Sequence, residues 1–271
     1  MNVVALLACR PLRVPVVINE RNNPVQQHMG GVWEWLRRRS YPKCRMAVAQ
    51  TNEVAQQLQE FVGADRLHVI PNGVKQPQQN WQEDPSRPAR FLAVGRLSPQ
   101  KGFDLLIRAF ALLANKHPDW ELQIAGEGQE RSSLESLVTE LNLDMSVSLP
   151  GWVETPAKLF CSTRVFVLSS RYEGFPNSLL EAMATGVPVV SFDCDFGPGE
   201  IIQHEVNGLL VPAEDVQRLA SQMERLMLDE DLRVRLSQQA QKVVDQFKVS
   251  DYFDRWDALL EEWCHVDERK R

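Results

Sequence analysis

The stretch SSRYEGFPNSLLEAMATGVPVV, residues 169–190, decides the fold of this chain. The apolar run Val165–Leu168 just before it is short and bounded, as expected of a buried parallel strand. Gly174 and the proline two residues later break that strand, and residues 178–184 predict a helix that ends at Gly186. The valines that close the stretch predict the start of the next strand, so the whole is expected to be one repeat of a parallel α/β sheet.

Two carboxylates flank the turn of this repeat, Glu173 and Glu181. Glu173 is expected at the carboxyl end of the strand, where α/β sheets bind ligands, and Glu181 about one turn into the helix. The turn collects unpaired backbone N–H groups and the positive end of the helix dipole, which favours a phosphate. A carboxylate on the helix can instead accept hydrogen bonds from a pair of hydroxyls. From the spacing alone, an ordinary βαβ unit with two surface glutamates remains an alternative.

The stretch resembles the E-x(7)-E signature of retaining GT-B glycosyltransferases, specifically glycosyltransferase family 4 (glycosyl transferases group 1). Further motifs of that family follow the expected order, and together they cover roughly residues 66–262. They are Val94-Gly95-Arg96-Leu97 with Lys101-Gly102, Ile124-Ala125-Gly126-Glu127-Gly128, Leu149-Pro150-Gly151-Trp152 and Asn207-Gly208-Leu209-Leu210-Val211-Pro212. The resemblance implies two Rossmann-like doubly wound domains. Members usually begin with about a hundred residues that have no counterpart here, so we expect an N-terminally truncated chain whose first domain is incomplete.

Composition is that of an ordinary soluble globular protein, with 271 residues, 44% hydrophobic and 24% charged. A net charge of −6 gives no global field that favours nucleic acid, so no nucleic-acid partner is expected. The five cysteines are odd in number and scattered without a C-x-x-C pair, which argues against a disulfide framework or a zinc site and for a reducing cytoplasm. The apolar run Val3–Cys9 imitates a signal peptide, but it is short and lacks a preceding positive segment. A buried helix or strand fragment is therefore expected there.

The domain organisation is predicted from composition and periodicity. Residues 1–75 are expected to form a partial N-terminal, acceptor-side domain, and the Gln-, Pro- and Asp-rich residues 76–88 a linker. Residues 89–246 are expected to form a nucleotide-sugar-binding Rossmann-like domain, and residues 247–271 a C-terminal helix that packs back on the first domain. Strands are predicted at 14–18, 46–49, 67–70, 90–95, 121–125, 146–149, 165–168, 187–192 and 206–211. Helices are predicted at 32–41, 53–62, 103–116, 129–141, 156–161, 178–184, 215–228, 232–246 and 250–263.

The resemblance implies a binding site for the diphosphate of a nucleotide-sugar donor. Arg96 and Lys101, on the loop after the strand at 90–95, would supply the counter-charges, and Ser178 and Leu179 would present backbone amides. A solvated loop with two basic residues is the alternative from spacing alone. No metal is expected, because Asp193-Cys194-Asp195 imitates the D-x-D motif of a different glycosyltransferase fold.

The rest of the donor site is likewise implied by the resemblance. Glu173 would be a catalytic residue that addresses the donor sugar, together with the backbone at Gly174, Phe175, Pro176 and Asn177. Glu181 would hold the ribose hydroxyls. The base would lie near Gly151, Trp152 and Val153.

A further catalytic position, Glu20, is expected in a polar loop, Asn19–Pro24, where many relatives place a histidine next to the donor sugar. Either Glu20 takes that role, or Arg21 supplies a charge, or the two form a salt bridge within the loop. Because no secure covalent nucleophile is visible, we expect retaining front-face transfer in which the departing phosphate helps to deprotonate the acceptor.

These implications give one expected function and one alternative. The chain is expected to transfer a hexose or N-acetylhexosamine, most simply from a UDP-sugar, to a growing glycan or polyprenyl-linked acceptor in polysaccharide biosynthesis. The alternative is a donor-binding remnant without turnover. The basic and aromatic stretch Trp33–Arg39 is either a solvated helix face or a peripheral contact of this cytoplasmic protein with the inner membrane face.

Overall fold

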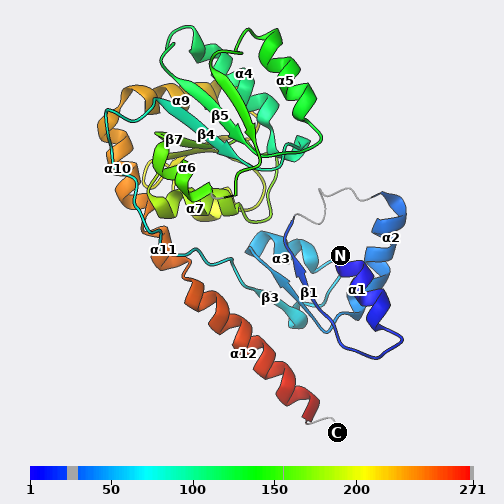
Figure 1. The fold of residues 1–271 in the computed structure, drawn as a ribbon. Helices are drawn as coiled ribbons and strands as arrows, with labels where there is room; N and C mark the ends of the chain where they lie inside the picture. The colour runs from blue at the N-terminus through cyan, green and yellow to red at the C-terminus, as the bar shows by residue number, and fades with distance from the viewer. Residues whose placement is uncertain (23–29, 155, 269–271) are drawn as a thin grey trace. The chain divides into compact units, whose positions relative to one another are not determined.

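A computed structural model describes residues 1–22, 30–154 and 156–268, with side chains up to residue 263 (Figure 1). The chain divides into two compact units, Val74–Gln246 and Met1–Gly73 with Phe247–Arg271. Within the described residues, no helix has both the length and the apolar character needed to cross a membrane.

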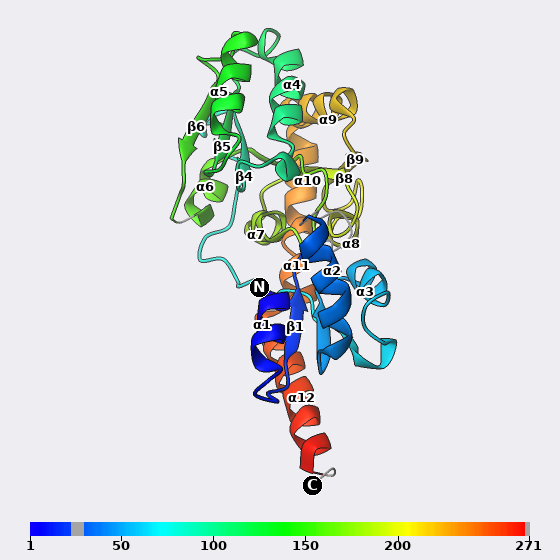
Figure 2. The same ribbon diagram turned by 90° about the vertical axis from the view of Figure 1, so that its right-hand side faces the viewer.

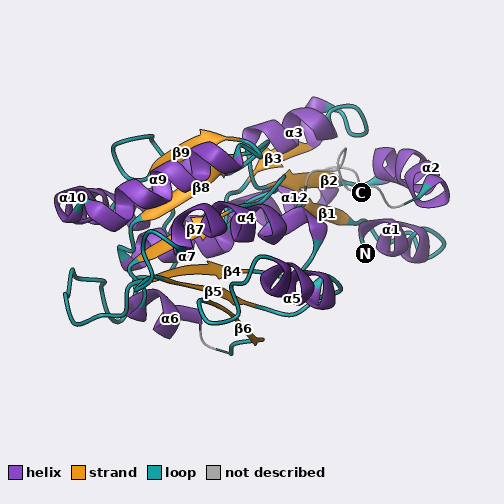
Figure 3. Cartoon of the chain, turned by 90° about the horizontal axis from the view of Figure 1, so that it is seen from above, coloured by secondary structure: helices purple, strands orange, loops and turns teal. Residues whose placement is uncertain are grey.

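The second unit is built on a parallel sheet with the strand order β6-β5-β4-β7-β8-β9 (Figure 3). Its strands are β4 (Arg90–Val94), β5 (Glu121–Ala125), β6 (Val147–Gly151), β7 (Val165–Leu168), β8 (Val189–Asp193) and β9 (Leu209–Pro212). All four residues of β7 are buried, as expected when helices cover both faces of a parallel strand. The predicted α/β class and the predicted parallel pairing are confirmed.

Helices cover both faces of this sheet. On one face lie α4 (Phe103–Ala114), α5 (Arg131–Glu140) and α9 (Val216–Leu228), and on the other α6 (Pro156–Ser162) and α7 (Asn177–Thr185) (Figures 1 and 2). The apolar core of this unit includes four side chains that are 0% exposed: Phe91, Leu106, Phe110 and Met223. The predicted helix over 178–184 is confirmed, and Gly186 ends it in the left-handed conformation with φ of 88°.

The prediction of one continuous helix over residues 232–246 is wrong. The structure has α10 (Glu230–Ala240) and α11 (Val243–Gln246), joined by a turn. Gln241 packs directly against Gly186 at the end of α7, where a methyl group on the glycine would meet the Gln241 amide nitrogen at 2.3 Å. This tertiary contact outweighs the helical periodicity of the sequence.

The segment predicted as a linker, residues 76–88, has little regular structure but is firmly packed within the second unit. Trp81 is 3% exposed, and its indole N–H donates to the Thr163 carbonyl at 2.8 Å. Glu83 accepts both hydrogen bonds of the Arg233 fork, at 3.0 and 2.9 Å, and the Arg233 side chain is only 4% exposed. Trp81 and Glu83 therefore provide the buried contacts of this otherwise polar segment.

The first unit contains a parallel sheet of order β1-β2-β3, with β1 (Val17–Glu20), β2 (Met46–Ala49) and β3 (Leu67–Val69). Around it lie α1 (Asn2–Cys9), α2 (Gly31–Ser40), the 3-10 turns η1 (Tyr41–Lys43) and η2 (Ala64–Arg66), and α3 (Asn52–Leu58). The last helix, α12 (Val249–Glu268), joins this unit because buried Leu259 packs with Met46, Val48 and Ile70.

The strand predicted at residues 14–18 begins and ends later than expected. Pro15 has no N–H to donate to a ladder, and pairing with β2 begins only at Val17, opposite Met46. Glu20 is therefore the last strand residue and not part of a loop. Asn23 and Pro24, the end of the predicted polar loop, lie outside the described residues.

Candidate functional site

The candidate site lies at the point where the sheet of the second unit changes direction. The chain passes from β4 to β5 and β6 on one side, then returns beside β4 with β7 and continues to β8 and β9. The loops after β4 and β7 therefore diverge at the carboxyl edge of the sheet and leave a crevice, which is the usual ligand position in open α/β sheets. The predicted residues Lys101 and Glu173 belong to these two loops.

Lys101 and Glu173 form an ion pair at this point. The Lys101 ammonium lies 2.6 Å from Glu173 Oε1, and the two side chains are 18% and 6% exposed. The Ser170 hydroxyl donates to the same carboxylate oxygen at 2.6 Å. One largely buried cation and one buried anion thus compensate each other, and an incoming diphosphate could take over the cation.

The close approach of the two loops depends on Gly102. This residue has φ of 59°, in the left-handed region, and directly follows the 3-10 turn η3 (Pro99–Lys101). A Cβ atom on Gly102 would lie 2.1 Å from the Ser169 carbonyl oxygen. Only glycine therefore allows Lys101 to reach the end of β7.

The turn between β7 and α7 buries most of the residues predicted to face the donor sugar. Gly174, Phe175 and Pro176 are buried, whereas Asn177 is exposed. The Leu179 N–H already donates to the Pro176 carbonyl at 3.1 Å. Among the described residues, the Ser178 amide has no acceptor, so Ser178 is the better placed of the two predicted phosphate amides.

Glu181 lies on α7, one turn into the helix as expected, and its side chain is solvent-accessible. Desolvation by the atoms packed around it nevertheless raises the pKa of this carboxyl above its usual value. A partly desolvated carboxylate gains more from donated hydrogen bonds than one surrounded by bulk water.

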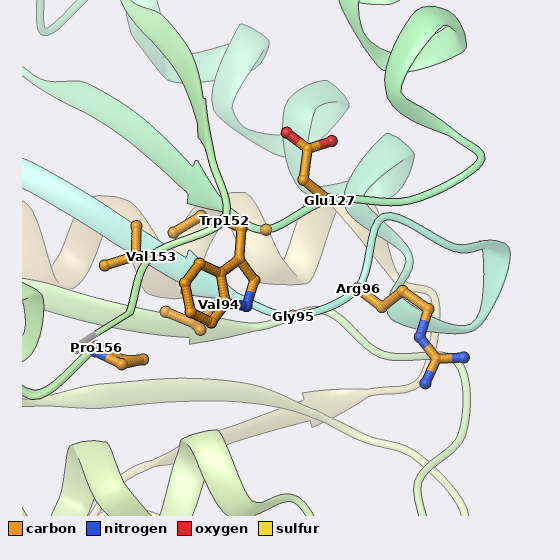
Figure 4. A pocket seen from close by; sticks show the side chains of 9 residues that line it. Val94, Gly95, Arg96, Glu127, Trp152, Val153 and Pro156 are labelled. Atoms are coloured by element: carbon orange, nitrogen blue, oxygen red, sulfur yellow. The ribbon is translucent and has the colours of Figure 1, made fainter.

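A pocket of about 370 Å³ opens at the carboxyl ends of β4, β5 and β6 (Figure 4). The Trp152 ring stands over Val94 and Gly95, while the exposed Arg96 side chain extends away from that ring. Val153, predicted to lie near the base, also lines the pocket. The complete lining consists of Val94, Gly95, Arg96, Ala125, Gly126, Glu127, Trp152, Val153 and Pro156.

Close backbone contacts fix the floor of this pocket. The Gly126 N–H donates to the Gly151 carbonyl at 2.8 Å, and a Cβ atom on Gly126 would lie 1.8 Å from the Gly95 carbonyl oxygen. Gly151, a predicted base-binding residue, therefore supports the floor and is not among the lining residues. The loops after three neighbouring strands are held in register without side chains between them.

The other predicted catalytic residue, Glu20, belongs to the first unit and is buried, with 7% exposure. The Tyr41 hydroxyl donates to Glu20 Oε2 at 2.6 Å. Burial, together with the negative charge of Glu20, raises the pKa of Tyr41 well above its usual range. The prediction of a loop position for Glu20 is wrong, and its carboxylate has a partner within its own unit.

Among the described residues, no group of three His, Cys, Asp or Glu side chains is placed to hold a metal ion. Of the D-x-D-like residues, Asp193 ends β8, and the Asp195 carbonyl accepts the Glu173 N–H at 3.3 Å. The four cysteines whose side chains are described, Cys9, Cys44, Cys161 and Cys194, are free.

Sequence reasoning did not assign roles to three residues that the structure places at the site. Ser170 directs the Glu173 carboxylate, Glu127 lines the pocket, and Arg171 joins the loops around Lys101. Glu127 belongs to a quoted glycine-rich motif, so its motif was a usable signal. Ser170 and Arg171 both lie in the deciding stretch. The Ser170 contact to Glu173 spans only three residues, whereas the Arg171 contacts connect loops about seventy residues apart and are not visible in local patterns.

Comparison with known proteins identifies the family. The chain matches the family described as Glycosyl transferases group 1 over residues 75–243, and Glycosyltransferase Family 4 over residues 1–76. It is 36% identical over 266 residues to an exopolysaccharide phosphotransferase of Streptomyces coelicolor, covering 97% of this chain and 27% of that protein. It is 28% identical over 262 residues to the Campylobacter jejuni protein named GalNAc-α-(1→4)-GalNAc-α-(1→3)-diNAcBac-PP-undecaprenol α-1,4-N-acetyl-D-galactosaminyltransferase, covering 96% of this chain and 72% of that protein.

Solved structures show the same fold. Anabaena HepE, solved with UDP and glucose, superposes with a TM-score of 0.84 at 22% identity, over 96% of this chain and 74% of HepE. S. aureus TarM, solved with UDP among its ligands, gives a TM-score of 0.81 at 22% identity, over 90% of this chain and 50% of TarM. The chain thus spans half of TarM and about a quarter of the Streptomyces protein. The fold is GT-B, and the chain belongs to the glycosyl transferases group 1 family.

Proposed function

We propose that this chain binds a nucleotide-sugar donor at the switch point of its second unit and transfers the sugar to a glycan or lipid-linked acceptor. The observation that carries the proposal is the Lys101–Glu173 ion pair at the junction of β4 and β7. A donor diphosphate brings negative charge that can replace Glu173 as the partner of Lys101. Glu173 is then released to accept hydrogen bonds from the donor sugar.

Each part of the donor has a proposed set of contacts. Lys101, Arg96 and the Ser178 amide at the start of α7 bind the diphosphate, which the helix dipole also favours. Glu181 accepts hydrogen bonds from the ribose hydroxyls. The base occupies the pocket beside Trp152 and Val153, which offers an aromatic face and an apolar wall.

UDP is the proposed nucleotide, and a hexose or N-acetylhexosamine the proposed sugar. Support comes from the solved structures of HepE with UDP and glucose and of TarM with UDP. A Bacillus subtilis relative, 26% identical over 182 residues, is named poly(glycerol-phosphate) alpha-glucosyltransferase. The sugar itself would be selected around residues 174–177, where only Asn177 is an exposed side chain.

The proposed transfer retains the anomeric configuration. Once Lys101 pairs with the diphosphate, Glu173 Oε1 still accepts the Ser170 hydroxyl hydrogen bond, which suits a carboxylate that orients a sugar better than one that attacks it. The bond between the anomeric carbon and the diphosphate oxygen breaks while the acceptor oxygen bonds to the same face. The departing phosphate oxygen takes the acceptor proton, and Lys101 stabilises the developing charge. Glu20, in the first unit, is proposed as the second catalytic residue.

The proposed acceptor is a glycan or polyprenyl-linked oligosaccharide, presented at the inner face of the membrane. The name of the Campylobacter relative includes an undecaprenol-linked acceptor. In α2 of this chain, Trp33 and Trp35 are 45% and 55% exposed, and Arg39 stacks on Trp35 at 5.0 Å. Exposed aromatic and basic side chains on one helix are typical of contact with anionic lipid.

The test is an acceptor-dependent transfer assay with the 271-residue chain. UDP-glucose and UDP-N-acetylglucosamine are each incubated with a polyprenyl-diphosphate-linked N-acetylhexosamine, and NMR follows the anomeric configuration of the product. We expect acceptor-dependent UDP release and an axial product bond, lost in Lys101→Met and preserved in the remote control Arg90→Met. UDP binding without any sugar transfer would contradict the enzymatic part of the proposal.

A further inference from the structure

Hydrogen bonds connect the backbone of the turn that carries Lys101 to the loop after β7. All three carbonyls of η3 accept a hydrogen bond from that loop, and the Gln100 side chain donates one in return. The bonds are Arg171 Nη1 to the Pro99 carbonyl at 2.7 Å, Arg171 N to the Gln100 carbonyl at 2.8 Å, Ser169 Oγ to the Lys101 carbonyl at 2.9 Å, and Gln100 Nε2 to the Tyr172 carbonyl at 3.0 Å. The backbone beneath Lys101 is therefore fixed by the loop that also carries Glu173.

Arg171 is the central member of this contact. Besides Pro99, its guanidinium forms a bidentate pair with Asp104 at 2.9 and 2.8 Å, and its Nε donates to Glu214 at 3.2 Å. Asp104 lies in the first turn of α4, and Glu214 follows β9. One side chain thus connects the loops after β4, β7 and β9.

Asp104 is held in its ionised form beside the Arg171 guanidinium, so the ion pair between them is maintained. Partial burial opposes ionisation of Asp104, but the hydrogen bonds and charge of Arg171 outweigh it and lower the pKa of Asp104 below its usual value. Lysine could not reproduce the contact, because a single ammonium cannot present a planar fork to Asp104 and a third donor to the Pro99 carbonyl.

We propose that Arg171 is a positioning residue for the donor phosphates: through Pro99 and Asp104 it holds the η3 turn so that the Lys101 ammonium meets the diphosphate. This inference rests on the proposed function of the site. It assigns Arg171 no contact with the donor. Its effect passes through Lys101, so it concerns the phosphates and not the base.

That separation gives a readout that a merely structural role would not produce. UDP carries the diphosphate, whereas uridine offers only the base and the ribose. Loss of Arg171 should weaken UDP binding and leave uridine binding unchanged, since the pocket beside Trp152 is built from the loops after β4, β5 and β6 at backbone contacts that Arg171 does not make.

The experiment compares Arg171→Met with Arg90→Met in the 271-residue chain. Arg90 is a matched control, because it also directs two guanidinium nitrogens at a carboxylate, Glu121 Oε2, but at the opposite end of β4 and β5. We expect the Kd for UDP, measured by calorimetry, to rise about tenfold in Arg171→Met, or ~1.4 kcal/mol, with no change in Arg90→Met. The Kd for uridine, measured by ligand-observed NMR, should stay constant in both. Equal weakening of UDP and uridine, or no weakening of either, would overturn the proposal.

A second measurement does not depend on the donor. Amide hydrogen exchange across residues 96–105 of the free protein should accelerate in Arg171→Met and not in Arg90→Met. If the wild-type chain binds no UDP, the proposed function fails, but unchanged exchange in this segment would independently overturn the positioning role. Arg171→Lys, which keeps the charge without the fork, should give an intermediate exchange rate and serves where Arg171→Met does not fold.

Discussion

The two ends of the candidate donor site are built differently. At the phosphate end, Lys101 and Glu173 are largely buried, and the turn beneath Lys101 is fixed by hydrogen bonds on all its carbonyls. At the base end, Trp152 is 72% exposed and stands over an open pocket. The proposed phosphate-binding part is therefore built into the fold, whereas the proposed base-binding part lies on the surface. Stability and binding should therefore be coupled at one end and independent at the other.

The largest effect is expected for Lys101→Met. It removes the proposed phosphate counter-charge and leaves the buried Glu173 carboxylate with Ser170 as its described side-chain donor. Stability should fall by about 3 kcal/mol, because breaking a buried pair leaves an uncompensated charge. UDP binding should weaken about a hundredfold. Urea denaturation and calorimetry measure the two effects, and Lys101→Met combined with Glu173→Leu should regain part of the stability but none of the binding.

Gly102→Ala should break the phosphate end without removing any charge. A left-handed backbone costs a non-glycine residue roughly 1–2 kcal/mol, and the new methyl group would collide with the Ser169 carbonyl. The loops must separate, so both stability and UDP binding should decrease together. An alanine variant that keeps full UDP affinity would show that the approach of Lys101 to β7 does not matter for the donor.

Trp152→Ala should have the opposite signature at the base end. An exposed ring contributes little to folding, so the free energy of unfolding should stay within ~0.5 kcal/mol of the wild type. Binding of UDP and of uridine should weaken in the same proportion, by about tenfold, because a base stacked on an aromatic ring gains ~1–3 kcal/mol. A Trp152→Ala variant with unchanged uridine binding would place the base elsewhere.

The smallest effect is expected for Glu181→Gln on stability. The folded-state pKa of Glu181 is raised, so the folded protein holds this proton more tightly than the unfolded chain does. The ionised group therefore destabilises the fold at neutral pH, and that penalty declines as the pH falls through the folded-state pKa and is gone below the unfolded-state pKa. Because the Glu181 side chain is solvent-accessible, screening keeps the penalty small, and Glu181→Gln should melt only slightly above the wild type at pH 7. Thermal melts between pH 7 and pH 4 should show the gap closing, and a gap that widens in acid would contradict this sign.

The sequence allowed much of the second unit to be predicted, because its signals are local. The apolar run Val165–Leu168, the turn at Gly174 and the glycine that ends α7 act within a few residues of themselves, and the parallel fold follows from their repetition. The packing of Trp81 and the break at Gln241 depend on residues far away in the chain, so composition and periodicity could not show them.

The sequence predicted which loops form the candidate site, but not the contacts between their side chains. Motifs brought Lys101 and Glu173 into one crevice, but not their direct pairing. The prediction of a loop position for Glu20 is wrong because the strand begins after Pro15, at Val17, and ends two residues later than the pattern predicts. Whether the predicted residues bind a donor stays a prediction.

The central claim is a nucleotide-sugar donor site at the junction of β4 and β7, and calorimetric titration of UDP into the 271-residue chain tests it most directly. We predict one binding site with a micromolar Kd, which Lys101→Met weakens about a hundredfold and Arg90→Met leaves intact. The absence of heat with UDP at millimolar concentration, or an unchanged Kd in Lys101→Met, would contradict the claim.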